Sequence, residues 1–422
     1  MSQLLVLVFL AFFLLRWAVE TGLAGLNLAH LLATPATVPE PLKGRLDEAT
    51  AGKSRDYTLA RLRFGLLLGA GHALGVLATL FSGVLPWLEG ALARSGLAGA
   101  HLFVAFLVSL TLAFSLAHLP FSLYALFGIE TRFGFNRMTW RMWLLDRLKL
   151  GALAAALGLP FLYAVYGFMQ WSGGWWWAWL FGFITVWQLA LGWLYPSLIA
   201  PLFNRFEPLP EGELRTRLEA LARQAGFRTG GIFVMDASRR SGHSNAYFTG
   251  LFRPRIVLFD TLLEEMPVDE SLAVLAHEIG HFRMRHVRRG LLLGLAWLFL
   301  MLFVLSLLAG WPPLFSAFGF AAPSHHGLLA LVGLGGGAFT FFVAPLLAWL
   351  SRRREYAADS YSVRLLNLPG ALKSALVRLN GQNLSNLNPH PWYSGYHYSH
   401  PTLLQRLAAV DRLGAAGGVP PA

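Results

Sequence analysis

Residues 277–310 read HEIGHFRMRHVRRGLLLGLAWLFLMLFVLSLLAG, and both the fold class and the chemistry follow from them. The second part, Leu291 to Gly310, is apolar and uncharged over 20 residues. That is the length of helix that crosses a hydrocarbon core of about 30 Å. The first part opens with two histidines four residues apart, which lie about 40° from each other around a helix and can reach one cation. The stretch therefore predicts a metal site beside a membrane span.

The composition of the whole chain supports a membrane protein. Of 422 residues, 55% are hydrophobic and only 13% are charged, which is not typical of a soluble domain. Because seven stretches are long and apolar enough to span a bilayer, we expect an all-α polytopic membrane protein with seven transmembrane helices. The predicted spans are Leu4 to Leu32, Phe64 to Leu88, His101 to Phe127, Leu148 to Gln170, Trp175 to Ile199, Leu291 to Gly310 and Leu328 to Leu350.

The basic residues are arranged for a membrane and not for nucleic acid, despite a net charge of +12. Of the 34 Lys and Arg residues, 32 lie in or beside alternate connections, and the exceptions are Arg16 and Arg94. This is the positive-inside rule. It predicts an outer N-terminus, with the loop after the fifth span and the C-terminal part in the cytoplasm. The first span lacks a basic n-region, so we expect it to be retained. The absence of cysteine excludes disulfides and thiolate metal ligands.

Four regions follow from this plan. Residues 1–200 hold the first five helices, 201–288 form a cytoplasmic loop domain, 289–350 hold helices six and seven, and 351–422 form a C-terminal cytoplasmic domain. In the loop domain, β-rich runs predict a small sheet of two or three strands. These runs are Gly231–Met235, Ser244–Thr249 and Arg255–Phe259.

Two helices frame the predicted site. The first has Asp269 as its candidate N-cap and carries His277 and His281, and we expect it to continue through Arg283–Arg289 into the sixth span. The second has Pro401 in its first turn and ends near Leu413, with a disordered tail after it.

A catalytic zinc needs three protein ligands and one open position. His277 and His281 supply two ligands. Glu355 is the best third candidate because the run Glu355-Tyr-Ala-Ala-Asp359 places two carboxylates four apart on one helical face just past the seventh span. Asp359 would then orient a ligand histidine from behind. Glu278 would be the general base.

Simpler explanations exist for each part taken alone. Two histidines four apart are often a solvated helix face, and Glu355 with Asp359 could form surface ion pairs beside Arg352–Arg354. The pentad His277-Glu-Ile-Gly-His281, its expected cytoplasmic position and the downstream carboxylates agree with one another, so we favour the metal site.

These motifs resemble a known family, the type I CAAX prenyl proteases, which are integral-membrane zinc metalloendopeptidases. The resemblance spans nearly the whole chain and includes the seven-span plan. The motifs that carry it are Asn245-Ala-Tyr-Phe-Thr-Gly250, Arg255-Ile-Val-Leu-Phe-Asp-Thr-Leu262, the pentad, Glu355 to Asp359, and Tyr398-Ser-His-Pro-Thr-Leu-Leu-Gln-Arg406.

The resemblance implies a gluzincin-like domain holding one Zn²⁺ per chain and a catalytic Glu278. It places substrate and transition-state groups at Asn245 with Ala246, at His400 and at Arg406. A cationic or hydrogen-bonding side chain such as His400 or Arg406 could stabilise the oxyanion of peptide hydrolysis. A strand at Asn245 could hold an extended peptide by edge pairing. A turn-forming role for Asn245 and a surface role for Arg406 stay open.

The implied substrate is a peptide or protein with a CAAX-type C-terminus, prenylated or not, from which the last three residues are released. Other membrane-associated peptides are equally compatible with the motifs. The lipid bilayer is a partner and nucleic acid is not. The Ala-, Leu-, Gly- and Arg-rich composition is typical of a bacterial inner-membrane protein.

Three alternatives remain. A broad-specificity quality-control metalloprotease would use the same pentad. A site-2 intramembrane protease would bury the pentad inside an apolar span, and Arg283 follows too closely for that. A seven-helix transporter with an incidental metal site would show broken helices in inverted repeats, and we find neither in the sequence.

Overall fold

Seven helical segments of the computed structural model are long and apolar enough to cross a membrane, as expected. The structure describes residues 1–422 except 36, 228–229, 251–253 and 416–422. Several of these candidate spans are longer than their apolar cores. The seven candidate spans are Ser2–Ala33, Glu48–Phe81, Gly99–Phe133, Trp140–Trp171, Gly173–Leu202, His286–Ala309 and His325–Leu366.

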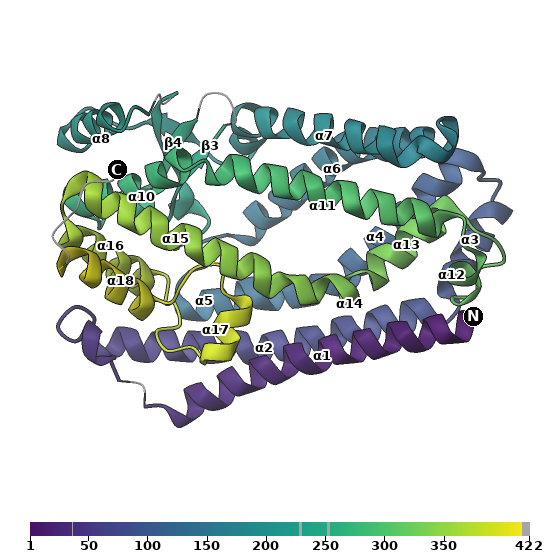
Figure 1. The fold of residues 1–422 in the computed structure, drawn as a ribbon, viewed down its shortest axis with the longest axis horizontal. Helices are drawn as coiled ribbons and strands as arrows, with labels where there is room; N and C mark the ends of the chain where they lie inside the picture. Colours follow the sequence, from purple (N-terminus) through teal and green to yellow (C-terminus); the bar gives the residue numbers. More distant parts are fainter. Residues whose placement is uncertain (36, 228–229, 251–253, 416–422) are drawn as a thin grey trace.

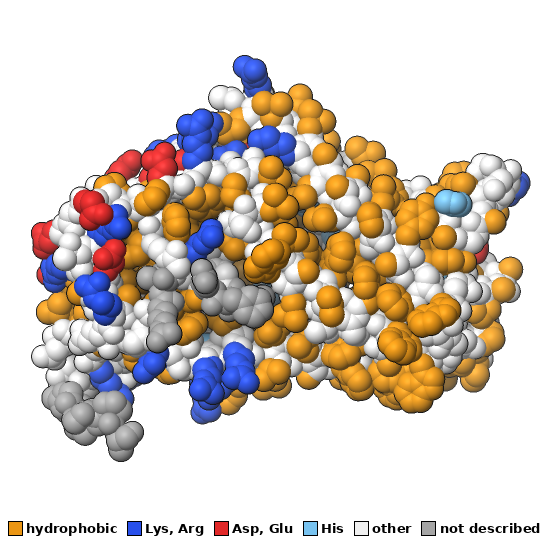
Figure 2. Space-filling model, turned by 90° about the horizontal axis from the view of Figure 1, so that it is seen from above, with side chains coloured by type: hydrophobic (Ala, Val, Ile, Leu, Met, Phe, Trp, Pro, Cys, Tyr) orange, Lys and Arg blue, Asp and Glu red, His pale blue; other side chains and the backbone are white. Residues whose placement is uncertain are grey.

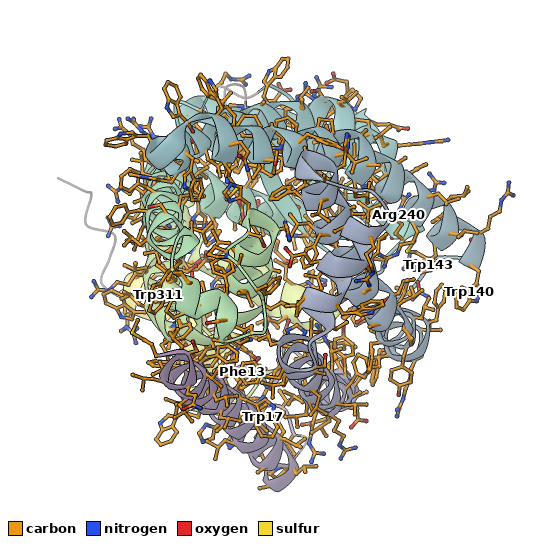
Figure 3. The ribbon with its side chains drawn as sticks, turned by 90° about the vertical axis from the view of Figure 1, so that its right-hand side faces the viewer. Phe13, Trp17, Trp140, Trp143, Arg240 and Trp311 are labelled. Carbon is orange, nitrogen blue, oxygen red and sulfur yellow. The ribbon has the colours of Figure 1, made fainter. Side chains whose placement is uncertain are left out.

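The long helices run along the longest axis of the molecule, and the sheet lies at one end of them (Figure 1). Helices α3 (Val84–Arg94) and α12 (Pro312–Ser316) and the N-terminus lie at the opposite end (Figure 1). Seen from above, charged side chains gather toward the sheet end, while hydrophobic side chains cover most of the remaining face (Figure 2). Viewed along the long axis, the helices are distributed around the molecule and are not stacked in layers (Figure 3). The polar end therefore adjoins a helical body whose surface is suited to lipid.

The spans are built from ten α-helices joined in places by short irregular turns of helix. The α-helices of the spans are α1 (Ser2–Ala33), α2 (Glu48–Phe81), α4 (Gly99–Leu123), α5 (Thr131–Phe133), α6 (Trp140–Trp171), α7 (Trp176–Leu194), α11 (His286–Ala309), α13 (His325–Gly335), α14 (Gly337–Thr340) and α15 (Ala344–Leu366). The π and 3-10 turns within them are η2 (Tyr124–Glu130), η3 (Gly173–Trp175), η4 (Tyr195–Ile199), η5 (Ala200–Leu202) and η7 (Phe341–Val343).

The remaining helices connect the spans or form the polar end. They are η1 (Glu40–Leu42), α3 (Val84–Arg94), α8 (Glu213–Gln224), η6 (Ala237–Arg239), α9 (Asp260–Leu263), α10 (Val268–Arg283), α12 (Pro312–Ser316), α16 (Pro369–Gln382), α17 (Pro391–His397) and α18 (Leu403–Ala415). Helix α15 crosses residue 350 without a break, and the division of the chain at that point remains a prediction.

A four-stranded sheet forms the base of the polar end. Its order is β1-β2-β4-β3. Strands β2 and β4 are parallel, whereas β1 pairs with β2 and β3 pairs with β4 in antiparallel fashion. The prediction was two or three strands. All three of the runs that the sequence indicated form strands, and β1 is an addition that the sequence did not indicate. The strands are β1 (Phe206–Pro208), β2 (Ile232–Met235), β3 (Ala246–Thr249) and β4 (Arg255–Phe259).

The core of the polar end lies between the sheet and two helices. Apolar side chains of β4, α8 and α10 form one buried cluster, so burial of these faces holds α10 against the sheet. Members of this cluster are Leu218, Leu221, Ile256, Leu258, Leu272, Leu275 and Ile279.

Two predicted helix limits near the spans are wrong. The second predicted span ran from Phe64 to Leu88, but α2 ends at Phe81 because Gly83 adopts a left-handed conformation (φ 79°) and starts α3. The pentad helix does not continue into the sixth span either. It ends at Arg283, and Arg285 takes a positive φ of 57° before α11 begins. That turn changes which side chains meet at the site.

The predicted helix starts also need correction. Asp269 is not an N-cap, because Pro267 holds that position and the Asp269 carboxylate accepts a hydrogen bond from Arg217 at 2.6 Å. Pro401 precedes α18 instead of lying in its first turn. The Thr402 amide donates to Gln405 Oε1 (3.0 Å) and the Gln405 amide donates to Thr402 Oγ1 (3.4 Å), a capping box that starts the helix at Leu403. The predicted tail lies outside the described residues.

Candidate metal centre

Helices α10 and α15 pack closely, and this contact builds the centre. Gly280 makes it possible, because a Cβ at that position would lie 3.1 Å from Tyr361 Cβ and 3.3 Å from Ala358 Cα. The buried Ser362 hydroxyl also donates to the Ala273 carbonyl (2.8 Å) and links the two helices. Because the helices approach so closely, Glu355 on α15 faces the histidines of α10.

The three predicted ligand residues come together. His277, His281 and Glu355 each offer one ligand atom, and these atoms lie within 4.8 Å of one another. The two Nε2 atoms of the histidines are 3.2 Å apart. Glu355 Oε2 lies 3.4 Å from His277 Nε2, and Glu355 Oε1 lies 3.3 Å from His281 Nε2. His277 and Glu355 are buried and His281 is partly buried.

Asp359 holds His277 from behind, as the sequence predicted. Asp359 Oδ1 lies 2.8 Å from His277 Nδ1, which leaves Nε2 facing the other ligand atoms. Arg406 on α18 completes this arrangement by donating from Nε to Asp359 Oδ2 (2.9 Å) and from Nη2 to Oδ1 (2.5 Å). Burial opposes the charge on Arg406, but its bonds to Asp359 outweigh burial and raise the pKa of Arg406 above its ordinary value.

His281 has a corresponding partner that the sequence did not reveal. His286 Nδ1 lies 3.0 Å from His281 Nδ1, and the His286 side chain is buried. In one continuous helix, residues five apart do not face each other. The left-handed turn at Arg285 brings His286 back toward His281, and no local sequence signal predicts such a turn at an arginine.

The residues present fit a metal ion. Glu355 Oε2 is buried and makes no hydrogen bond of acceptable geometry within the described residues, although His400 Nδ1 lies 2.8 Å away. An unsatisfied buried carboxylate oxygen beside two imidazole nitrogens is suited to a cation. Two histidines and one glutamate also form a donor set found in catalytic zinc sites. Burial raises the pKa of the adjacent Glu278, although His277 and His281 act in the opposite direction.

The other predicted site residues fall into two groups. His400 and Arg406 adjoin Glu355, with Arg406 Nη1 4.0 Å from Glu355 Oε2. Asn245 and Ala246 instead lie where β3 begins, on the edge strand of the sheet that contacts α10. The Asn245 side chain is exposed and accepts a hydrogen bond from the Ala246 amide (2.8 Å).

A cavity of about 830 Å³ opens beside the centre. Its walls come from α1, α2, the end of α16, α17 and the segment that follows it, and both His400 and Arg406 line it. The volume is in the range of ligand-binding pockets. The centre is therefore open toward a space large enough for part of a peptide.

Seven candidate membrane spans, a His-Glu-x-x-His helix, a downstream glutamate facing its histidines and an adjoining cavity together define the class of membrane-embedded metallopeptidases. Comparison with known proteins leads to the same class. Residues 27–205 match the family model described as CAAX prenyl protease N-terminal, five membrane helices. Residues 208–413 match Peptidase family M48.

The relatives extend over nearly the whole chain. A CAAX prenyl protease 1 homolog from Arabidopsis thaliana is 38% identical and covers 89% of this chain and 90% of its own length. The Homo sapiens homolog is 34% identical, with 96% of each covered. A crystal structure of S. mikatae Ste24p superposes with a TM-score of 0.89 at 32% identity, covering 96% of this chain and 98% of that one.

The chain therefore belongs to the CAAX prenyl protease 1 family of M48 membrane metalloproteases. The family assignment does not favour the transporter or the quality-control alternative. Within the described residues, α10 is not among the candidate spans, which argues against a site-2 protease. The M48 family implies a metal ion, and the His-His-Glu group is the part of the structure that suits it.

Proposed function

We propose that this protein is a zinc endopeptidase that cleaves CAAX-type peptides near their C-terminus, with or without a prenyl group. The observation that carries the proposal is the His277, His281 and Glu355 group beside Glu278, opening on a cavity. We further propose one zinc ion per chain and a bacterial inner-membrane location, with the centre and C-terminus in the cytoplasm and the N-terminus outside. The alternating distribution of basic residues supports this topology.

Each residue then has a role in adding water across the scissile amide. A zinc ion bound by the three ligands would supply Lewis acidity and make water nucleophilic near neutral pH. Glu278 accepts the proton of the attacking water and returns it to the amine that leaves. Asp359 orients His277. His400 and Arg406 stabilise the negative charge that develops on the carbonyl oxygen, and the Nη1 of Arg406 remains directed toward the site.

The substrate strand would pair with β3. Because β3 is at the end of the strand order, one of its edges has no neighbouring strand in the described sheet. An extended peptide could add to that edge through main-chain hydrogen bonds, with Asn245 and Ala246 at its start. Contact between β3 and α10 would place the peptide beside the pentad.

Substitution of Glu278 by Gln in detergent-purified protein tests the proposal. The variant should retain its zinc and cleave a CAAX peptide about 10²- to 10⁴-fold more slowly, as expected for the loss of a general base. The products of prenylated and unprenylated peptides are identified by mass spectrometry. Unchanged cleavage would exclude the role of Glu278. If elemental analysis finds no zinc and added zinc restores no hydrolysis, the metal mechanism is wrong.

A further inference from the structure

Arg61 is a cation of the cavity wall that the catalytic arrangement does not use. It lies on α2, is exposed, and lines the same cavity as His400 and Arg406. Its only close polar contact among the described residues is with the Tyr57 hydroxyl (3.3 Å), and its guanidinium stacks over the Tyr57 ring at 5.4 Å. No carboxylate of the described chain forms an ion pair with it. Arg61 lies just before the apolar stretch of α2, and a cation that lines a cavity without a carboxylate partner is suited to an anionic ligand.

The carboxylates nearest to this region are already engaged. Glu130 accepts a hydrogen bond from Tyr57 (2.7 Å), and its other oxygen lies 3.3 Å from His243 Nε2. Glu20, which also lines the cavity, lies 3.5 Å from Arg16 Nε. Arg61 interacts electrostatically with Glu130, but both oxygens of that carboxylate already have other partners.

Asn27 provides a second, independent feature of the same wall. It is fully buried on α1, and its Oδ1 accepts a hydrogen bond from the His390 amide (2.8 Å). Its Nδ2 has no hydrogen-bond partner within the described residues and it lines the cavity. A buried donor without a partner costs free energy, so an acceptor at this point would stabilise the protein.

Arg61 and Asn27 line the same cavity from two neighbouring helices. Leu31 of α1 clusters with Leu59 and Leu62 of α2, which holds the two helices together in the region that carries both residues. A cation and a neutral donor together suit a carboxylate, which accepts several hydrogen bonds at once.

We propose that Arg61 and Asn27 bind the terminal carboxylate of the peptide substrate. This inference rests on the proposed function, because a CAAX peptide ends in a free carboxylate close to its scissile bond. The cavity can hold a peptide end of this length. Three extended residues span about 10 Å, and a sphere of about 830 Å³ is about 12 Å across. The carboxylate receptor would set the distance from the chain end to the cleaved bond.

The test uses the full-length protein and one farnesylated CAAX peptide in two forms, the free acid and the C-terminal amide. Wild type should cleave the acid about 10- to 100-fold better in kcat/KM, as expected for a hydrogen-bonded charge pair. Arg61→Gln should remove that preference, mainly through KM, and leave cleavage of the amide within about twofold. Arg61→Lys should keep part of the preference, because it keeps the charge.

Two further variants separate a role in binding the carboxylate from a general effect on the structure of the helices. Arg63→Gln is the matched control, because Arg63 is exposed on the same helix and does not line the cavity. Arg63→Gln should leave kcat/KM unchanged for both the free acid and the amide. Asn27→Asp places a carboxylate in the receptor and should weaken cleavage of the acid selectively.

Three results would overturn the inference. Equal cleavage of acid and amide by wild type excludes a carboxylate receptor. Equal losses for both peptides in Arg61→Gln show that Arg61 acts only by supporting Tyr57. If Arg61→Gln cleaves both peptides as well as wild type does, Arg61 has no role in substrate binding. If wild type cleaves neither peptide with zinc bound, the proposed function itself fails, and the inference fails with it.

Discussion

Replacing Asp359 with Asn should weaken both metal binding and stability, because this carboxylate serves two partners at once. Its side chain is 1% exposed and that of Arg406 is 14% exposed. Removing one member of a buried ion pair costs about 3–5 kcal/mol, since the other charge stays buried without compensation. Losing the bond that orients His277 should lower metal affinity by about 10- to 100-fold.

The assay follows both quantities in the same detergent-purified protein. Metal content is measured after dialysis against a zinc buffer, and the unfolding temperature is followed by tryptophan fluorescence in metal-free protein. Asp411→Asn is the control, because Asp411 of α18 is 59% exposed in its ion pair with Lys373 of α16, and pairs near the surface contribute about 1 kcal/mol or less. It should leave both quantities unchanged.

The double variant Asp359→Asn with Arg406→Gln separates the two effects. It removes both buried charges, so it should recover much of the stability but none of the metal affinity. If Asp359→Asn alone binds zinc as tightly as wild type and unfolds at the same temperature, the assigned role of Asp359 is wrong.

Three further outcomes are expected. Glu355→Ala should lower zinc affinity more than about 100-fold, and far more than Asp359→Ala does, and equal metal content in the two after dialysis would exclude Glu355 as the third ligand. Gly280→Ala should cost about 1–3 kcal/mol and weaken metal binding because the added methyl group separates α10 from α15, and unchanged zinc content would show that the helix spacing is not critical. A cysteine introduced at Ser324 should react with a membrane-impermeant reagent from outside the cell, whereas labelling only from the cytoplasm would reverse the proposed topology.

The parts of the centre that the sequence predicted are those set by spacing within one helix. His277 with His281, and Glu355 with Asp359, are pairs four apart whose common face follows from helical geometry. The seven apolar segments were predictable for a similar reason, because their length and composition reflect the bilayer.

The features that the sequence did not predict depend on contacts between distant segments or on single backbone turns. His286 reaches His281 only through the turn at Arg285, where a continuous helix was the simpler expectation. Strand β1 has three residues, includes Pro208, and forms only by pairing with β2. The link from Arg406 to Asp359 requires α18 to pack on α15, which no local pattern specifies.

The split origin of the ligands has a consequence for biosynthesis. The two histidines precede α11, and Glu355 lies on α15 in the second half of the last candidate span, so two candidate spans begin between them in the chain. On the proposed ligand set, a ribosome-bound chain that has not yet inserted its last candidate span lacks Glu355 and should not hydrolyse peptides. The protein should then acquire its proteolytic activity only as its membrane insertion is completed.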